Sequence, residues 1–420
     1  MAETHPVGDQ SSTRRSRIGL ALAGGGPIGG VYELGTLQAL DEAFDGIDLT
    51  DLDVYVGVSS GSFLAASLAN QISPTKLCQI FIDNDDPNYN FSPEIFLKPA
   101  LKEYFDRISS VPKLFLDVFW SLTKNPCEFG ESFSCLGGLI PTGIFDNETI
   151  NKALTNMYTA QHRTNDFRKL NKKLYVIAAE LDTGRTIKFG APGYDHVPIS
   201  RAVQASAALP GLFPPVEIDG HYFVDGALLK TLHASIALDQ GIDLAICVNP
   251  LVPYDAELAL QQKGASKHSN LVRGGLPVVL SQTFRAIIHS RMQVGMSKYD
   301  LLYENADVLL FEPNRDDAEM FFTNVFSYSS RHHLCEHAYQ FTRQELLARR
   351  EQLEPILARH GITLRLDILR DRTRHATPQI TREHSATTQK GVKKAAGDLT
   401  DSLNELQDWL RTQKMSKISH

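Results

Sequence analysis

Two stretches near the N-terminus decide the fold: Arg17-Ile-Gly-Leu-Ala-Leu-Ala-Gly-Gly-Gly-Pro27 and Val54-Tyr-Val-Gly-Val-Ser-Ser-Gly61. Each begins with an apolar run of the length of a buried strand and ends in a turn that contains glycine. After the first turn, apolar residues recur at helical spacing: Ile28, Val31, Leu34 and Leu37. Two strand–turn–helix units in succession predict an α/β fold with a parallel sheet.

Further along the chain, three more apolar runs have the length of strands: 173–179, 243–249 and 306–311. Helical patterns cover about 276–296 and 332–360. The α/β pattern therefore continues well past the first two units, with helices following it.

The composition excludes several classes of protein. A hydrophobic share of 42% with 22% charged residues is typical of a folded protein, and the net charge of −7 over 420 residues argues against nucleic acid as a partner. The five cysteines are scattered and form no C-x-x-C pair, which favours reduced thiols in a cytoplasmic protein. No apolar run is long enough to span a bilayer, and residues 1–16 have no signal-peptide pattern.

The glycine loop Gly24-Gly-Gly-Pro-Ile-Gly29 is compatible with two chemistries. It fits the G-x-G-x-x-G pattern of a nucleotide-binding oxidoreductase, which also requires an acidic residue at the end of the next strand. Here Asp51 and Asp53 precede that strand instead. Alternatively, the backbone N–H groups of Gly24, Gly25 and Gly26 at the start of a helix form an oxyanion hole for acyl transfer.

The second turn fits the G-x-S-x-G pattern of a serine hydrolase. Ser59 is the candidate nucleophile, and the N–H of Ser60 is a further oxyanion-hole candidate. Gly57 and Gly61 permit the sharp turn that raises Ser59 above the sheet. A strand before the motif and a helix after it supply the context that this chemistry needs.

Asp225 is the candidate partner of Ser59. It closes the apolar run Tyr222-Phe-Val224 and is followed by Gly226, so its carboxylate is expected at the same rim of the sheet as the serine. A plain Asp-Gly turn is the alternative interpretation. The histidines that follow Ser59 show no signature of a catalytic base, and we interpret them as surface or core residues: His221, His233, His332 and His333.

Together the three sites resemble the patatin-like phospholipase family, whose motifs are Gly24–Gly29, Gly57–Gly61 and Asp225–Ala227 in this sequence. The similarity covers about residues 17–250. It implies a three-layer α/β/α fold with a mostly parallel central sheet. It also implies that Ser59 and Asp225 form a catalytic dyad without histidine, metal or cofactor, and that fatty acyl esters are cleaved through an acyl-enzyme.

One position departs from the family pattern. The glycine loop of the family usually carries Arg or Lys where this sequence has Ile28, so a cation that meets an anionic head group is missing. We therefore expect a lipid or fatty ester substrate of phospholipase A, lysophospholipase or esterase type, with neutral acylglycerols and thioesters also open. Transacylation is a variant of the same chemistry.

The resemblance leads to a division of the chain into segments. We expect a disordered N-terminus at 1–16, a catalytic domain at 17–315 with its motif core at 17–250, and a helical part packed on it at 316–370. A flexible linker at 371–398 and an amphipathic helix at 399–415 follow. The apolar stretch in 92–136 is either a core helix under a cap or a lid that contacts lipid.

Two other functions remain as alternatives to the lipid hydrolase. One is a catalytically silent binding protein that keeps the patatin fold, and the other is the nucleotide-binding oxidoreductase. We expect a cytoplasmic protein, with peripheral contact at a membrane left open. The sequence predicts no oligomeric state.

Overall fold

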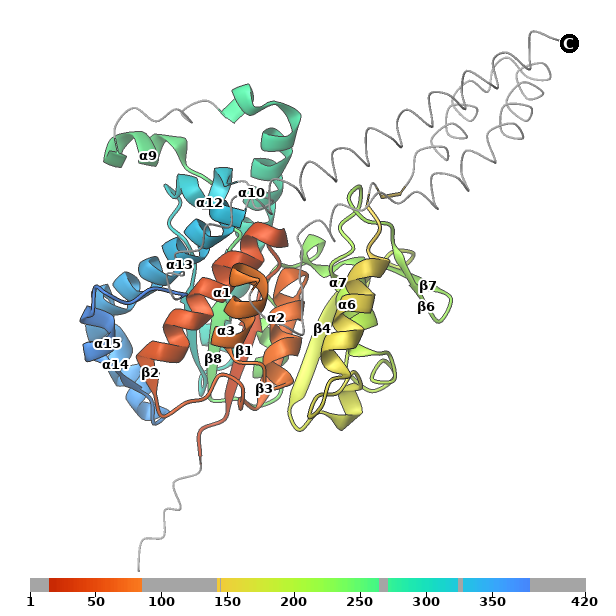
Figure 1. Ribbon diagram of the computed structural model, residues 1–420, viewed down its shortest axis with the longest axis horizontal. Coiled ribbons are helices and arrows are strands. Elements are labelled where there is room, and N and C mark those ends of the chain that lie inside the picture. Colours follow the sequence, from red (N-terminus) through yellow and green to blue (C-terminus); the bar gives the residue numbers. More distant parts are fainter. Residues whose placement is uncertain (1–14, 85–141, 144, 264–270, 324–327, 378–420) are drawn as a thin grey trace, which may run out of the picture.

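The computed structural model describes residues 15–84, 142–143, 145–263, 271–323 and 328–377 (Figure 1). Four predicted segments lie wholly or mostly outside these ranges: the N-terminus, the apolar stretch in 92–136, the linker and the helix at 399–415. None of the helices in the described ranges has the length and apolarity needed to cross a membrane.

The central sheet has the strand order β6-β7-β4-β3-β1-β8-β9, with β5 paired to β4. Its strands are β1 (Ile18–Leu22), β3 (Val54–Val58), β4 (Lys173–Glu180), β5 (Thr186–Phe189), β6 (Val216–Ile218), β7 (His221–Asp225), β8 (Leu244–Val248) and β9 (Asp307–Phe311). The strands from β4 through β3, β1 and β8 to β9 are parallel, whereas β5, β6 and β7 are antiparallel to their neighbours. The predicted α/β class with a mostly parallel sheet is confirmed.

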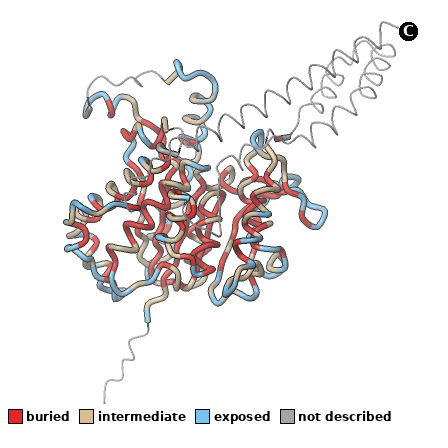
Figure 2. The backbone as a smooth tube through the Cα atoms, in the orientation of Figure 1, coloured by how far each residue is buried: buried red, intermediate tan, exposed pale blue. Residues whose placement is uncertain are grey.

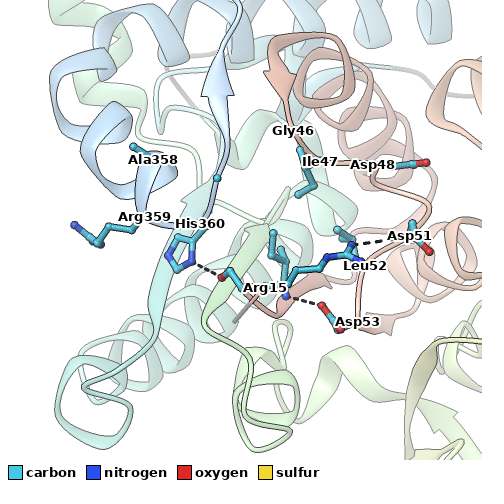
Figure 3. A pocket seen from close by; sticks show the side chains of 13 residues that line it. Arg15, Gly46, Ile47, Asp48, Asp51, Leu52, Asp53, Ala358, Arg359 and His360 are labelled. Atoms are coloured by element: carbon cyan, nitrogen blue, oxygen red, sulfur yellow. Dashed lines mark hydrogen bonds and ion pairs between the residues drawn. The ribbon is translucent and has the colours of Figure 1, made fainter. Parts of the chain in front are cut away.

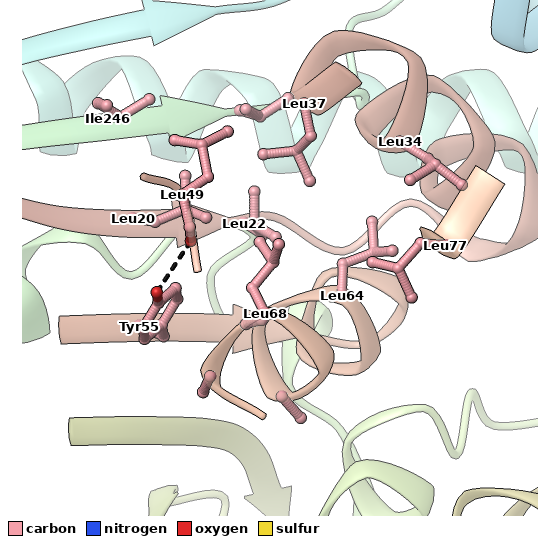
Figure 4. Close-up of a cluster of buried hydrophobic side chains, with 14 of the residues drawn as sticks. Leu20, Leu22, Leu34, Leu37, Leu49, Tyr55, Leu64, Leu68, Leu77 and Ile246 are labelled. Atoms are coloured by element: carbon pink, nitrogen blue, oxygen red, sulfur yellow. Dashed lines mark hydrogen bonds between the residues drawn. The ribbon is translucent and has the colours of Figure 1, made fainter. Parts of the chain in front are cut away.

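Alternate residues of the buried strands point to opposite sides of the sheet. Both faces are therefore apolar, and helices cover both of them. On one face Leu20 and Leu22 pack with α1 (Gly26–Ala43), α2 (Ser60–Ala69), α7 (Ile199–Ser206) and α13 (Tyr328–Ala348) (Figure 4). On the other face Ala21 and Ala23 pack with α8 (Ala234–Leu238) and residues of α10 (Gly275–Met296) and α11 (Tyr299–Leu302). The three-layer arrangement is thus confirmed, and Figure 2 shows the buried residues concentrated in its middle.

The C-terminal part of the described chain is helical and packs on the sheet domain. It consists of α12 (Ala318–Phe322), α13, α14 (Arg350–Arg359), β10 (Thr363–Leu364) and α15 (Leu366–Arg370). The helical region predicted at 332–360 is divided at Arg349, where one helix ends and the next begins. β10 pairs with β2 (Phe44–Asp45), which ties this part to the end of α1.

Residues 371–377 belong to the predicted linker, yet they pack against α13. The Arg343 guanidinium donates to the carbonyl oxygen of Asp371 at 2.5 Å, and the Gln340 amide donates to that of Arg374 at 2.7 Å. The remaining described helices connect these layers: α3 (Pro74–Cys78), η1 (Gln79–Asp83), α6 (Glu148–Tyr158), η3 (Phe167–Lys169), η4 (Gly226–Leu228), α9 (Ala256–Lys263) and η5 (Leu271–Gly274).

Candidate active site

Ser59 occupies the turn between β3 and α2 in a backbone conformation that L-residues rarely adopt, with φ 51° and ψ −122°. Such strain is typical of functional positions and persists only when the surroundings hold it. A methyl group at Gly57 would lie 2.4 Å from the Cα of Ser62, and one at Gly61 would lie 2.5 Å from the carbonyl oxygen of Ala23. Both glycines are therefore required by close backbone contacts inside the turn.

Two serines fix the backbone of this turn. The Ser59 N–H donates to Ser206 Oγ at 2.8 Å, and that hydroxyl donates to the Ile177 carbonyl oxygen at 2.5 Å. On the other side, Ser62 Oγ donates to the Ser59 carbonyl oxygen at 2.6 Å. Residue 59 is thus held by α7 and by α2, which pack on the same face of the sheet. Neither serine was predicted from the sequence; the contact of Ser206 joins distant segments, whereas that of Ser62 is local.

The side chain of Ser59 donates a hydrogen bond to Asp225 Oδ2 at 2.7 Å. The sheet register brings the two residues together. Asp225 of β7 pairs with Ala178 of β4, while Val58, one residue before the serine, pairs with Ile177. Ser59 and Asp225 therefore flank Ala178 in one row across the sheet, at the carboxyl end of β3.

Asp225 is only 3% exposed, and burial raises the pKa of its carboxyl to about 6. Two hydrogen bonds act in the opposite direction, from Ser59 Oγ and from the Ala227 N–H, which donates to Oδ1 at 2.8 Å. Desolvation is the larger effect. The group stays ionised at neutral pH while being a stronger base than an exposed aspartate.

The glycine loop lies directly against this pair. A methyl group at Gly24 would be 2.7 Å from the Ala227 Cβ and 3.1 Å from the Ser59 Cβ. The Gly24 N–H, which the sequence analysis placed in the oxyanion hole, donates to the Thr231 carbonyl oxygen at 3.3 Å. The contribution of Gly24 is therefore the close approach of the loop to Ser59.

The other three predicted oxyanion-hole donors differ in their availability. The Gly25 N–H donates to Ser60 Oγ at 3.1 Å, so that hydroxyl occupies it. Within the described part of the chain, the N–H groups of Gly26 and Ser60 have no hydrogen-bond partner, and each stands at the first residue of a helix. Unpaired N–H groups at two helix starts favour negative charge in front of Ser59.

A buried acid behind the loop was missed by the sequence analysis. Glu33 of α1 is 0% exposed, and burial raises the pKa of its carboxyl well above 4.5, although the nearby Ala23 backbone and Ser60 hydroxyl lower it. Neither carboxyl oxygen makes a well-formed hydrogen bond. A glutamate between Tyr32 and Leu34 on a helix that follows a glycine loop was the signal available in the sequence.

The histidines named in the sequence analysis lie away from this chemistry in the described structure. His221 is exposed and pairs with Glu180 at 2.8 Å. His233 is buried, and desolvation lowers the pKa of its ring to about 3. His332 and His333 have acidic neighbours on the C-terminal side of the fold, Asp83 and Glu319. The hydrogen-bond partner of Ser59 Oγ is the carboxylate of Asp225.

A pocket of about 450 Å³ lies at the opposite edge of the sheet, at the amino ends of β1 and β3 (Figure 3). Asp51 and Asp53 are part of its lining. A dinucleotide needs its acidic ribose ligand at the carboxyl end of the strand, beside the glycine loop. The two aspartates are at the wrong edge for that role. In the described ranges no group of three or more His, Cys, Asp or Glu side chains is placed to hold a metal ion.

Comparison with protein families matches residues 20–238 to the family described as patatin-like phospholipase. The chain belongs to this patatin-like family. Its members are lipid hydrolases, and the match includes the glycine loop, Ser59 and Asp225.

Several solved structures are similar to this patatin-like chain at low sequence identity. VipD from Legionella pneumophila has 16% identity and a TM-score of 0.37, and the match covers 80% of this chain and 67% of VipD. The type III effector protein ExoU has 15% identity and a TM-score of 0.35, with 80% of this chain and 53% of ExoU covered. This chain therefore spans about two thirds of the length of VipD and about half of that of ExoU.

Proposed function

We propose that this patatin-like protein hydrolyses fatty acyl esters with Ser59 as nucleophile and Asp225 as the general base. The observation that carries the proposal is the hydrogen bond of 2.7 Å from Ser59 Oγ to Asp225 Oδ2. Nucleophile and base must be within hydrogen-bond reach, and this pair is. The strained backbone of Ser59 and the raised pKa of Asp225 support the assignment.

In the first half of the reaction, Asp225 accepts the proton of Ser59 as its oxygen attacks the ester carbonyl carbon. The negative charge that forms on the carbonyl oxygen faces the N–H groups of Gly26 and Ser60. Each donor of this kind contributes roughly 3–4 kcal/mol to transition-state stabilisation. The Gly25 N–H becomes a third donor when the Ser60 hydroxyl rotates away from it.

The intermediate then collapses, and the carbon–oxygen bond to the alcohol breaks as the alcohol takes the proton from Asp225. The acyl group remains on Ser59 Oγ. In the second half, Asp225 accepts a proton from water as the water attacks the acyl carbon. The fatty acid leaves, and Ser59 recovers its proton.

Position 28 in the glycine loop is basic in most of the family but is isoleucine here. This difference restricts the set of substrates that we propose. Ile28 is half-buried and packs against the core of the sheet domain, so it presents no charge to a head group. We therefore propose esters without a required anionic head group as substrates, which includes neutral acylglycerols and lysolipids as well as simple fatty esters.

The test uses p-nitrophenyl esters of several chain lengths with wild type, Ser59→Ala and Asp225→Asn. We expect both substitutions to lower kcat/KM by at least about 10³-fold, since groups that act as a unit fail together. Asp225→Asn should also raise the melting temperature at pH 8, because a buried ionised carboxylate is replaced by a neutral side chain. That stability measurement separates lost chemistry from lost folding.

Two outcomes would contradict the proposal in different ways. If Asp225→Asn remains active while Ser59→Ala does not, another residue is the base and the dyad is wrong. If wild type neither turns over any ester nor reacts with a fluorophosphonate probe, the chain is a binding protein that keeps the fold.

A further inference from the structure

The helix α10 carries an exposed apolar stripe on its outer side, although Met292 on its inner side packs into the core. Its exposed apolar residues recur at helical spacing along one side: Leu276, Val279, Leu280, Phe284, Ile287 and Val294. Leu276 is 69% exposed, and Phe284 and Ile287 are each 51% exposed. We call these six residues the outer stripe of α10. Surface helices usually turn such a stripe toward the core.

The inner face of α10 is held by polar contacts. Gln282 clamps Tyr254, accepting from its N–H at 3.0 Å and donating to its carbonyl oxygen at 2.7 Å. The buried Arg285 donates to the Val252 carbonyl oxygen at 3.3 Å and lies 5.0 Å from the ring centre of Phe321. The outer stripe is therefore left outward by a specific attachment of the other face.

The charged residues in the sequence of α10 are all cations, whereas Glu312 from a neighbouring segment acts on the pKa of His289 on the inner side of the helix. The sequence contains no Asp or Glu between Glu257 and Asp300, in a chain with 49 acidic residues and a net charge of −7. Arg273 and Lys298 stand at the two ends of α10 and Arg291 lies along it, and all three are exposed. Cations beside an exposed apolar stripe are the pattern of a helix that lies in the interface of an anionic membrane.

The contacts of α10 place it at the edge of the sheet that carries Ser59. Arg291 donates to the carbonyl oxygen of Leu229, four residues after Asp225, at 3.3 Å. The Val252–Tyr254 segment that holds the inner face follows Pro250, which packs against Gly25 and Gly29 of the glycine loop. In Figure 1 α10 stands at the upper edge of the molecule, above α1, and Figure 2 shows much of it exposed.

We propose that the outer stripe of α10, with Arg273, Arg291 and Lys298, is the surface by which this hydrolase docks on an anionic lipid bilayer. The stripe enters the acyl boundary while the three cations meet lipid phosphates. Docking there brings the rim with Ser59 to the bilayer that holds its substrate. The inference rests on the proposed function for the statement that the bilayer holds the substrate. The binding of α10 to a bilayer does not depend on that function. If two copies of this chain met through this face of α10, the cations of one copy would lie opposite the cations of the other.

The experiment measures co-sedimentation with vesicles in a Ser59→Ala background, so that no lipid is consumed. Vesicles of phosphatidylcholine alone are compared with vesicles of phosphatidylcholine and phosphatidylglycerol in equal parts. We expect binding to the anionic vesicles, and a loss of about tenfold or more in Phe284→Ser/Ile287→Ser. The matched variant Phe284→Leu/Ile287→Leu keeps the apolar stripe and should bind as the parent does.

The charge contribution has its own matched pair. Arg273→Gln should weaken binding to anionic vesicles about fivefold and leave the weaker binding to phosphatidylcholine unchanged. Lys169→Gln removes an exposed cation from η3, which lies before the amino end of β4, and should have no effect on either. With Ser59 restored, Phe284→Ser/Ile287→Ser should hydrolyse a soluble p-nitrophenyl ester at the wild-type rate and lose activity on vesicle lipid.

Three results would overturn the docking proposal. Unchanged vesicle binding in Phe284→Ser/Ile287→Ser would show that the outer stripe is not the contact. A smaller particle in that variant by size-exclusion chromatography would assign the stripe to contact between copies. A melting temperature lowered by several degrees would show that another part of the chain packs on it. Vesicle binding without esterase activity would instead leave the docking surface intact and remove the proposed function.

Discussion

Two pairs of carboxyl groups, at opposite edges of the central sheet, differ in electrostatic character. At the carboxyl edge, burial raises the pKa of Asp225 and of Glu33, and among the described residues no cation is paired with either. At the amino edge, partial burial would raise the pKa of Asp307, but Arg359 and His360 outweigh it and lower that pKa. Asp51 has a lowered pKa as well, chiefly through its hydrogen bond with Lys172.

The candidate active site thus lies at one edge of the sheet, and contacts between distant segments of the chain lie at the other. The amino edge has the pocket, where Ser16 Oγ lies 2.6 Å from His360 Nδ1 of the C-terminal part and Arg15 pairs with Asp51. The carboxyl edge holds strained backbone and acids that burial leaves uncompensated. Groups whose pKa is raised by burial are the ones prepared for proton transfer.

Outside the pair of Ser59 and Asp225, the largest expected effect of a substitution comes from closing the space beside Ser59. Gly24→Ala would place a methyl group 2.7 Å from the Ala227 Cβ and 3.1 Å from the Ser59 Cβ, which pushes the glycine loop outward. We expect kcat/KM on a soluble ester to fall about 100-fold, as when one oxyanion-hole donor is lost.

The matched control for this substitution is Gly295→Ala. A methyl group there meets only Lys230 Cε, at 3.8 Å, and kcat/KM should stay within about twofold of wild type, the range of a surface substitution. Equal activities of Gly24→Ala and wild type would mean that the loop does not form part of the catalytic site.

The next effect is the pH dependence of catalysis. Asp225 must be ionised to accept a proton, and its pKa is raised to about 6 by burial. A plot of kcat/KM against pH should therefore be flat above pH 7 and fall about tenfold per unit below pH 6, reaching about 100-fold at pH 4. An acid limb centred near pH 4 would show that the base is an exposed carboxylate, and would remove the contrast between the two edges.

The smallest effect is a pair of stability changes with opposite signs. Glu33 has a raised folded pKa, so it favours folding below about pH 4.5 and this stability is lost as the pH rises. Asp307 has a lowered folded pKa, so its contribution is present above about pH 3.8 and is lost as the pH falls. At pH 8 Glu33→Gln should raise the melting temperature by a few degrees, and Asp307→Asn should lower it.

Calorimetry at pH 8 and pH 5 checks both signs. The stabilisation by Glu33→Gln should shrink at pH 5, where more of the unfolded chain keeps its proton. If the two substitutions change the melting temperature in the same direction, the two edges do not differ in the way described.

The parallel strands of the sheet, the sheet class and the candidate pair of Ser59 and Asp225 were accessible from the sequence because they depend on local patterns, whereas β5 and β6 were not predicted. Apolar runs, glycine turns and an Asp-Gly step are each contained within a few residues. The antiparallel course of β7 was not accessible, nor was its register with β4, which pairs Asp225 with Ala178 and so places it level with Ser59. Strand direction is set by pairing between residues far apart in the chain.

The features that were missed have the same origin. Ser206, at the end of α7, accepts the N–H of Ser59 although it lies 147 positions away in the sequence. Gly24 looked like an oxyanion-hole donor until Thr231 proved to accept its N–H. The outer stripe of α10 fits the same apolar periodicity as a core-facing helix, and periodicity does not indicate which side faces the core. Only the contacts of Gln282 and Arg285 settle that orientation.

The packing of residues 371–377 has a consequence for anyone who shortens this chain. Arg343 is buried, and its guanidinium donates to the carbonyl oxygens of Ile368, Asp371 and Arg374. Ala376 donates its N–H to Glu336 at 2.8 Å. A protein cut at 371 would leave a buried cation short of acceptors beside α1, with poorer yield on expression as the expected sign.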